Sequence, residues 1–236
     1  MHDIPSRIAG HDWSTISASL NAHGNAVISP LLTPTECAAM VDLYDEPTGF
    51  RSTVVMARHG FGRGEYKYFA YPLPDLVAGL RAALYPRLAQ VANAWQQTLG
   101  LAAQFPAAHA DYLATCHVAG QTRPTPLLLR YGPDDFNCLH QDLYGELIFP
   151  LQVAVLLNRP GEDFTGGEFV LTEQRPRMQS RVEVVPLRQG DAVIFAVNHR
   201  PVMGVRGPYR VAMRHGVSRL HRGRRHTLGV IFHDAR

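Results

Sequence analysis

The sequence predicts an α+β fold in which N-terminal helices pack on a C-terminal double-stranded β-helix, the jelly-roll form of a β-sandwich. Helical patterns dominate up to residue 124, and short β-rich runs separated by Gly, Pro, Asn and Asp follow from residue 125. Short strands with such turn signals are typical of a sandwich or jelly roll. The length of 236 residues suits one domain. We therefore expect a single domain over 1–236, with a helical and hairpin extension (1–124) and a jelly-roll core (125–236).

Caps, spacing and turns define the N-terminal elements. A strand is expected at residues 26–29, and then a helix over 33–45, whose TPTE start supplies a capping threonine, a first-turn proline and a glutamate three residues after the cap. Residues 50–71 predict two strands around the glycine-rich turn HGFGRG. Leucines at helical spacing predict a helix over 74–99, in which a proline favours a kink. The alanine-rich residues 106–118 predict another helix.

The jelly-roll core is expected to consist of short strands in close succession. The runs are PLLLRY, FNCLHQD, LIFPLQVAVLLN, GGEFVLT, RVEVVP, DAVIFAV, YRVAMRHGV and HTLGVIFH. No internal repeat interrupts them, so we expect the extension and the core to form one compact unit.

The composition is that of an ordinary folded protein, with 46% hydrophobic and 18% charged residues. No apolar run has the length of a membrane helix, and the start MHDIPSRIAGHDW lacks the basic patch and apolar run of a secretory signal. The three cysteines are widely spaced and form no CxxC pair, which argues against a disulfide framework. We expect a cytoplasmic protein without a membrane or protein partner. The sequence does not indicate an oligomeric state.

The net charge of +3 hides a strong asymmetry along the chain. Residues 1–174 carry 10 Lys and Arg against 17 Asp and Glu, whereas residues 175–236 carry 13 Arg against 3 acidic residues. A basic C-terminal quarter favours binding of anions, such as a dicarboxylate or phosphates. A solvated arginine-rich surface is the alternative interpretation.

The motif His140-Gln141-Asp142 lies in an expected strand. Side chains two residues apart leave a strand on the same face, so His140 and Asp142 can point into the barrel together. With one further histidine they would form the two-histidine, one-carboxylate facial triad of non-haem Fe(II) oxygenases, which leaves coordination positions open for reactants.

A second HxD motif, His109-Ala110-Asp111, lies in an expected helix. On a helix, positions two apart diverge by about 200° and cannot share a metal ion. We therefore interpret His109 as a surface or packing residue.

The run RHGVSRLHRGRRHTL at residues 214–228 resembles the second half of the 2-oxoglutarate dioxygenase signature, in its prolyl-hydroxylase-like branch. In that superfamily the HxD motif is followed by a distal histidine and then by an arginine. Arg225 lies ten residues after His215, with a glycine before it and an apolar strand after it. GGEF at 166–169 and GDAVIF at 190–195 resemble two further strand starts of the same branch, so the resemblance covers about residues 125–234.

The resemblance implies a fold, a reaction and ligands. His140, Asp142 and His215 would hold Fe(II), and 2-oxoglutarate and O2 would be the cosubstrates of a dioxygenase that hydroxylates C–H bonds and releases succinate. A planar guanidinium binds a carboxylate with two parallel hydrogen bonds, so Arg225 would anchor the C5 carboxylate of 2-oxoglutarate. Thr227 and Tyr131 would assist it, although Tyr131 can equally be a half-buried strand aromatic.

One alternative assignment stays open at this point. His199 follows the VIFAV strand, and Arg210 lies eleven residues after it, so these two residues could be the ligand and the anchor. We favour His215 and Arg225, which implies a long insertion at residues 196–214. The histidines His221, His226 and His233 are interpreted as structural or exposed.

The whole chain also resembles a bacterial oxygenase family that is labelled as acting on alkylated, damaged DNA. That label implies oxidative demethylation of alkylated nucleic acid. We expect the 50–71 hairpin and the 196–214 insertion to form a substrate rim above the iron. The candidate rim residues are Arg58, Arg63, Tyr66, Lys67, Tyr68, Arg200 and Arg206.

Two other functions stay open. One is a hydroxylase of a protein side chain or a small metabolite that uses the same core. The other is a non-catalytic, cupin-like binding protein, against which the complete triad and Arg225 argue. A halogenase of this class would replace the carboxylate with a small residue, and Asp142 disfavours that variant.

Overall fold

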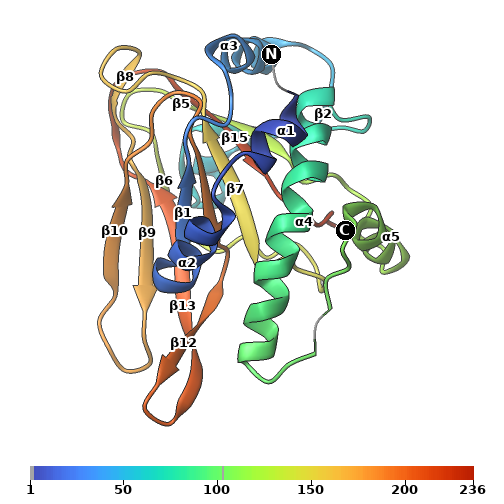
Figure 1. Cartoon of the computed structure of the whole chain (residues 1–236). Helices are drawn as coiled ribbons and strands as arrows, with labels where there is room; N and C mark the ends of the chain where they lie inside the picture. The colour runs from blue at the N-terminus through green and yellow to red at the C-terminus, as the bar shows by residue number, and fades with distance from the viewer. Residues whose placement is uncertain (1–2, 103) are drawn as a thin grey trace.

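Two antiparallel sheets face each other in the computed structural model, which describes residues 3–102 and 104–236 (Figure 1). The larger sheet has the order β1 (Asn25–Ile28), β11 (Ala192–Ala196), β7 (Leu151–Leu156), β15 (Arg225–Val230), β5 (Leu127–Tyr131), β4 (Glu65–Phe69) and β2 (Phe50–Val55). The smaller sheet has the order β10 (Arg181–Val185), β9 (Phe169–Gln174), β13 (Gly207–Val217), β6 (Phe136–His140) and β3 (Gly62–Arg63). The strand β12 (His199–Gly204) pairs with β13, and β8 (Phe164–Gly166) pairs with β14 (Leu220–Gly223).

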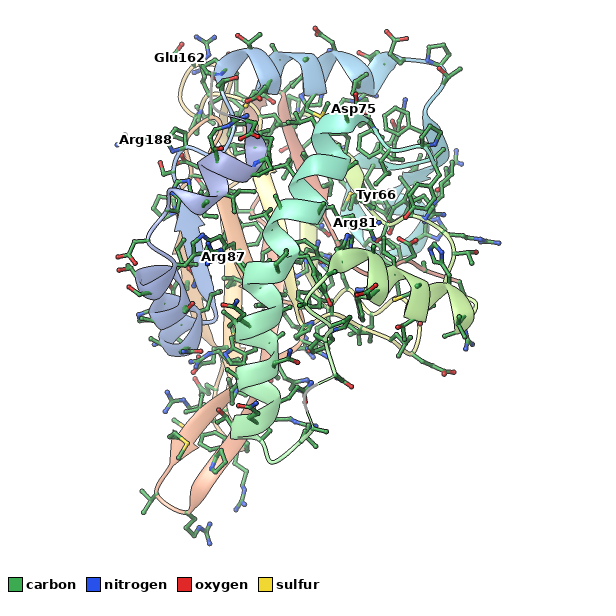
Figure 2. The ribbon with its side chains drawn as sticks, turned by 45° about the vertical axis from the view of Figure 1, so that its right-hand side comes forward. Tyr66, Asp75, Arg81, Arg87, Glu162 and Arg188 are labelled. Atoms are coloured by element: carbon green, nitrogen blue, oxygen red, sulfur yellow. The ribbon has the colours of Figure 1, made fainter. Side chains whose placement is uncertain are left out.

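Helices cover the outer face of the larger sheet. They are α1 (Ile4–Ala9), α2 (Trp13–His23), α3 (Pro34–Asp42), α4 (Asp75–Thr98) and α5 (His109–Val118), with 3-10 turns η1 (Leu43–Asp45) and η2 (Met56–His59). Figure 2 shows α4 in front of the strands, with Arg81 and Arg87 along its length. Its leucines at positions 80, 84 and 88 are fully buried in the main core. No helix of the described residues is long and apolar enough to cross a membrane.

The expected N-terminal elements are present. Helix α3 begins with a capping box, in which Thr33 accepts a hydrogen bond from the Glu36 backbone and the Glu36 carboxylate accepts one from the Thr33 backbone. Helix α4 continues through Pro86 without a break. The 50–71 segment forms the β2–β4 pair as expected, and its turn adds η2 and the short strand β3, which joins the smaller sheet.

The expected insertion at 196–214 consists mostly of paired strands. It forms most of the β12–β13 hairpin, which projects beyond the sandwich at the bottom of Figure 1. Its tip residue Val205 is fully exposed. The hairpin therefore prolongs the smaller sheet away from the barrel.

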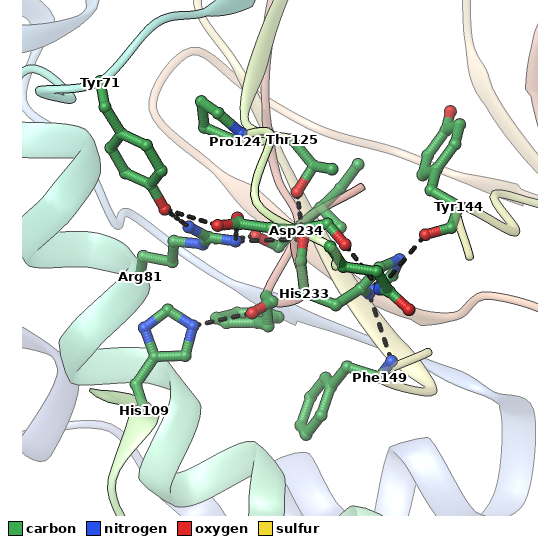
Figure 3. A network of polar contacts seen from close by, with 12 residues as sticks. Tyr71, Arg81, His109, Pro124, Thr125, Tyr144, Phe149, His233 and Asp234 are labelled. Atoms are coloured by element: carbon green, nitrogen blue, oxygen red, sulfur yellow. Dashed lines mark hydrogen bonds and ion pairs between the residues drawn. The ribbon is translucent and has the colours of Figure 1, made fainter. Parts of the chain in front are cut away.

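A buried polar network ties the helices to the end of the last strand (Figure 3). Arg81 of α4 donates to Asp234 (2.7 Å) and to the backbone carbonyl oxygen of Ile231 (2.7 Å). Tyr71 and His117 also bond the Asp234 carboxylate, each at 2.8 Å. Burial alone raises the pKa of Asp234, but the Arg81 charge and these hydrogen bonds lower it below its usual value. The carboxylate is therefore charged at neutral pH and balances Arg81.

The second HxD motif lies in the same region, where the helices contact the residues that follow β15. His109 is buried at the start of α5, and its Nε2 lies 2.8 Å from the Phe232 carbonyl oxygen. Burial lowers its pKa to about 4, so the ring is neutral and donates this hydrogen bond. The interpretation of His109 as a packing residue agrees with this position.

We predict that Asp234→Asn strongly destabilises the fold. It leaves the Arg81 guanidinium buried without its counter-charge, which should lower the free energy of unfolding by about 3–5 kcal/mol. Urea denaturation measures the loss. Asp134→Asn, which breaks an exposed ion pair with Arg219, is the matched control and should cost far less. Equal losses in the two variants would contradict the role of the network.

Candidate active site

The three predicted iron ligands converge between the two sheets. His215 of β13 lies directly opposite His140 of β6, because these antiparallel strands pair in that register. The His140 Nε2 lies 3.3 Å from one carboxylate oxygen of Asp142, and the His215 Nε2 lies 3.4 Å from the other. One ligand atom from each residue falls within 4.8 Å of the others. This spacing suits a single divalent ion held on one face.

The protonation of the three side chains is coupled to metal binding. The His140 Nδ1 donates to the Cys138 carbonyl oxygen (2.8 Å), so Nε2 is the ring nitrogen that faces Asp142. Burial lowers the pKa of His215, so its ring is neutral. Burial alone raises the pKa of Asp142, but hydrogen bonds and charges from the two histidines hold it well below its usual range. Burial alone lowers the pKa of His140, but the hydrogen bond and the charge of Asp142 raise it above its usual value. Metals bind neutral imidazoles and an ionised carboxylate, so a bound cation would take the place of the His140 Nε2 proton.

Two aromatic residues that sequence reasoning missed hold the triad in place. The Tyr144 hydroxyl donates to Asp142 (2.7 Å), and the Phe195 ring packs against the His215 ring at 4.5 Å between centroids. Such outer contacts orient metal ligands. Phe195 is the last residue of the GDAVIF run, so the sequence motif could have indicated that it lies near the site. Tyr144 belongs to no motif, and its contact depends on the turn after Asp142.

A second charged centre lies on the opposite sheet. Arg225 of β15 is 1% exposed, and it pairs in register with Tyr131 of β5. Its guanidinium donates to Thr227 at 2.5 Å and has no carboxylate partner among the described residues. Its Nε and the Tyr131 hydroxyl are buried without a hydrogen-bond partner. Buried polar groups are almost always paired, so this centre has the chemistry of a binding site for a carboxylate.

The GGE motif makes room for this arginine. Gly167 has a positive φ of 67°, and a Cβ atom there would come within 3.0 Å of the Arg225 side chain. Only glycine suits both the backbone angle and the close approach. The motif and Arg225 are therefore parts of one structure.

One cavity of about 340 Å³ connects the two centres. Its lining includes the three candidate ligands, Arg225, Thr227 and Tyr131. The described side chains thus place a metal-binding group and an unpaired cation in the same enclosed space.

Only some of the rim residues predicted in the 50–71 hairpin line this cavity. Tyr66 lines it, and Tyr68 packs behind, with its ring 5.3 Å from that of Tyr66. Lys67 lies on the other face of the strand, where its ammonium donates to the Tyr44 carbonyl oxygen. Arg58 and Arg63 are exposed on the η2 turn and on β3.

The prediction that the 196–214 segment forms the rim is wrong for its arginines. Arg200 is buried in an ion pair with Glu173 and donates to the Asn21 carbonyl oxygen. Arg206 is exposed at the tip of the projecting hairpin. Neither residue lines the cavity. The regular pairing of β12 with β13 carries both away from the metal ligands.

The alternative ligand and anchor lie elsewhere. His199 and Arg210 line a separate cavity between the C-terminal end of α4 and β12. His226 and His233 are buried within hydrogen-bonded structure, and His221 is exposed. Among the described histidines, only His140 and His215 belong to the metal-binding group.

A jelly roll that encloses two histidines, a carboxylate and an unpaired arginine defines the class of mononuclear non-haem iron oxygenases. Residues 64–235 match the family model described as "Oxygenase, catalysing oxidative methylation of damaged DNA", and the chain belongs to this family. It is 50% identical over 167 residues to an uncharacterized protein of Mycobacterium tuberculosis H37Rv, which covers 71% of this chain and 72% of that protein.

Solved structures share the fold at low sequence identity. A prolyl-4-hydroxylase of Pseudomonas putida superposes with a TM-score of 0.53 at 14% identity, covering 95% of this chain and 100% of that chain. A 2OG-Fe(II) oxygenase family oxidoreductase of Burkholderia pseudomallei gives a TM-score of 0.51 at 16% identity, covering 96% and 93%. The predicted double-stranded β-helix and the predicted oxygenase class are confirmed.

We predict that metal affinity separates His215 from His199. His215→Ala should abolish most Fe(II) binding under anaerobic conditions, whereas His199→Ala should leave it unchanged, because His199 lies outside the triad. Tyr144→Phe removes a bond that orients Asp142 and should weaken binding about 10–100-fold. Unchanged Fe(II) affinity in His215→Ala would rule out its assignment as a ligand.

We also predict that Arg225→Met raises the 2-oxoglutarate dissociation constant steeply while Fe(II) still binds. Loss of a buried charged partner should cost about 2–5 kcal/mol of binding free energy. Arg224→Met is the matched control, since that neighbouring arginine is exposed and outside the cavity. Calorimetry with the Fe(II)-loaded protein measures both variants, and equal affinities would exclude Arg225 as the anchor.

Proposed function

We propose that the protein is an Fe(II)- and 2-oxoglutarate-dependent oxygenase that removes methyl groups from DNA bases by oxidation. The observation that carries the proposal is the cavity that joins a metal-binding triad to a buried arginine that forms no ion pair with any described residue. A compact dicarboxylate can satisfy both ends at once, with its 2-oxo acid at the metal and its far carboxylate at the arginine.

The chain's residues have separate tasks in this scheme. His140, Asp142 and His215 would hold Fe(II) on one face, which leaves positions for the 2-oxo acid and O2. Arg225, Thr227 and Tyr131 bind the C5 carboxylate. Bound Fe(II) would supply the activation of O2, of which one oxygen atom enters the C–H bond and the other enters succinate as 2-oxoglutarate loses CO2. The apolar cavity walls exclude bulk water from this chemistry.

The substrate class follows from the family description together with the chemistry. Insertion of one oxygen atom into an N-methyl group gives an N-hydroxymethyl group, which breaks down to formaldehyde and the free amine. An oxygenase therefore removes methyl groups rather than adding them. Damaged DNA in the family description is consistent with a methylated base as the substrate.

A hydroxylase of a protein side chain is the second candidate. The observation in its favour is the shared fold with prolyl hydroxylases of Pseudomonas putida and Trichoplax adhaerens. A small metabolite substrate would use the same core. A non-catalytic binding protein would have no use for an intact triad beside an unpaired arginine.

We propose a cytoplasmic location for the enzyme. The three cysteines Cys37, Cys116 and Cys138 are all unpaired, and Cys138 is exposed. Exposed free thiols are most compatible with a reducing compartment.

A succinate-release assay across singly methylated oligonucleotides, peptides and free amino acids tests the proposal. We expect stimulation only by methylated oligonucleotides, with one formaldehyde formed for each succinate. Stimulation by a peptide or amino acid instead would replace DNA with that substrate and leave the oxygenase assignment intact. A lack of succinate under all conditions would contradict the enzymatic function.

Phosphate contacts are expected from the exposed arginines near the cavity. Arg58 and Arg63 lie on the turn and strand next to the cavity-lining residues Met56 and Phe61. For single-stranded DNA, each lost contact should reduce the slope of log affinity against log salt by about 0.7. We expect this reduction in Arg58→Glu and Arg63→Glu, but not in Arg206→Glu at the distant hairpin tip. Salt-independent binding by the wild type would exclude these contacts.

A further inference from the structure

One buried amide in the cavity has no partner. Gln152 of β7 is only 5% exposed, and its side chain lines the same cavity as the triad. Its Oε1 is buried without a hydrogen bond, and the amide bonds to no described residue. Burying an unpaired amide costs free energy, so such a group in a native protein calls for an explanation.

The position of Gln152 directs it toward the reactive end of the cavity. In the larger sheet Gln152 pairs with Phe195, the residue whose ring packs against His215. Ala154, two residues further along the same face of β7, also lines the cavity. Gln152 is therefore only one side chain away from a metal ligand.

Two of the neighbouring polar side chains already have partners. The Gln141 amide donates to the carbonyl oxygens of Asn198 and Met213. The Tyr144 hydroxyl donates to Asp142. The unpaired groups of Arg225 and Tyr131 are accounted for by a carboxylate of the cosubstrate. The His215 Nδ1 is also buried without a partner, but it belongs to a proposed metal ligand. Gln152 is the unpaired group that belongs neither to the triad nor to the Arg225 centre.

The surrounding walls are apolar and aromatic. Met56, Tyr66 and Phe61 line the cavity on one side, and Leu139 and Leu143 line it beside the metal motif. Phe61, Leu139 and Leu143 are 47%, 47% and 48% exposed, so they border its opening. Apart from the triad and Arg225, none of the described residues that line it carries a charged side chain. This end therefore suits a flat, neutral group.

We propose that Gln152 is a substrate-recognition residue that hydrogen-bonds the edge of a neutral methylated base. A glutamine amide presents a donor beside an acceptor, and this pattern matches a base edge with an acceptor beside a donor, as in adenine. The base lies between the apolar walls with its methyl group toward the triad. The inference rests on the proposed function and specifies how that site selects its substrate.

The proposal has a signature that does not depend on activity. In Gln152→Met the side chain keeps its length and loses the unpaired amide, so the free protein should melt at a higher temperature than the wild type. A structural glutamine predicts the reverse. Gln189→Met is the matched control, because the Gln189 amide donates to the Leu157 carbonyl oxygen at 2.9 Å. That variant loses a hydrogen bond and should melt at a lower temperature.

The second measurement is turnover of a single-stranded oligonucleotide that carries one N6-methyladenine, followed by formaldehyde release. Gln152→Met should raise the KM for the oligonucleotide about tenfold or more, the effect of one buried hydrogen-bonding group. Gln189→Met should leave that KM unchanged. A lower melting temperature in Gln152→Met, or an unchanged KM, would overturn the proposal.

Failure of the proposed function gives a different result. In that case the wild type releases no formaldehyde from any methylated oligonucleotide, although another compound stimulates succinate release. The KM comparison is then made with that compound. An unchanged KM in Gln152→Met refutes substrate recognition by Gln152. A raised KM retains Gln152 as a substrate-recognition residue but overturns the methylated base as the group that it binds.

Discussion

The register between β6 and β13 is the constraint on which the site depends. It sets His140 against His215, and a slip of one residue would turn one of the two rings to the outer face of the sheet. Gly216 supports this register, since a Cβ atom there would meet the Asn137 carbonyl oxygen at 2.7 Å. The pairing of β13 with β9 on its other side holds the same strand in place. The positions of the two histidine ligands are therefore set by the pairing of β13 with its neighbouring strands.

The cavity holds a buried carboxylate, Asp142, and a buried guanidinium, Arg225, that do not pair with each other. Burying Arg225 without an ion pair costs folding free energy. Asp142 is hydrogen-bonded by two histidines, whereas Arg225 is buried without an ion pair among the described residues, and burial lowers its pKa. Two other buried arginines are paired with carboxylates, Arg81 with Asp234 and Arg200 with Glu173. In contrast to these two arginines, the buried Arg225 lacks an ion pair, and an anionic ligand that binds there would offset the cost of its desolvation.

Sequence patterns could predict the parts of the site that recur at fixed spacing. The HxD strand, the step from His215 to Arg225 and the β-rich core depend on local periodicity, and the structure brings those residues into one cavity. Contacts made only by the folded chain could not be predicted, which is why Tyr144 and Gln152 were missed. Strand alternation alone separates Lys67 from its tyrosine neighbours, and the rim prediction overlooked it.

The β12–β13 hairpin has a practical consequence. Strand β13 runs without interruption from Gly207, beside the hairpin tip, to His215 at the metal site. At about 3.3 Å per residue, a dye attached at the fully exposed Val205 lies at most roughly 33 Å from that ligand. This length falls within the range of resonance energy transfer. Energy transfer between this dye and a labelled substrate would therefore report binding of the substrate at the barrel. The label would leave every residue of the cavity unchanged.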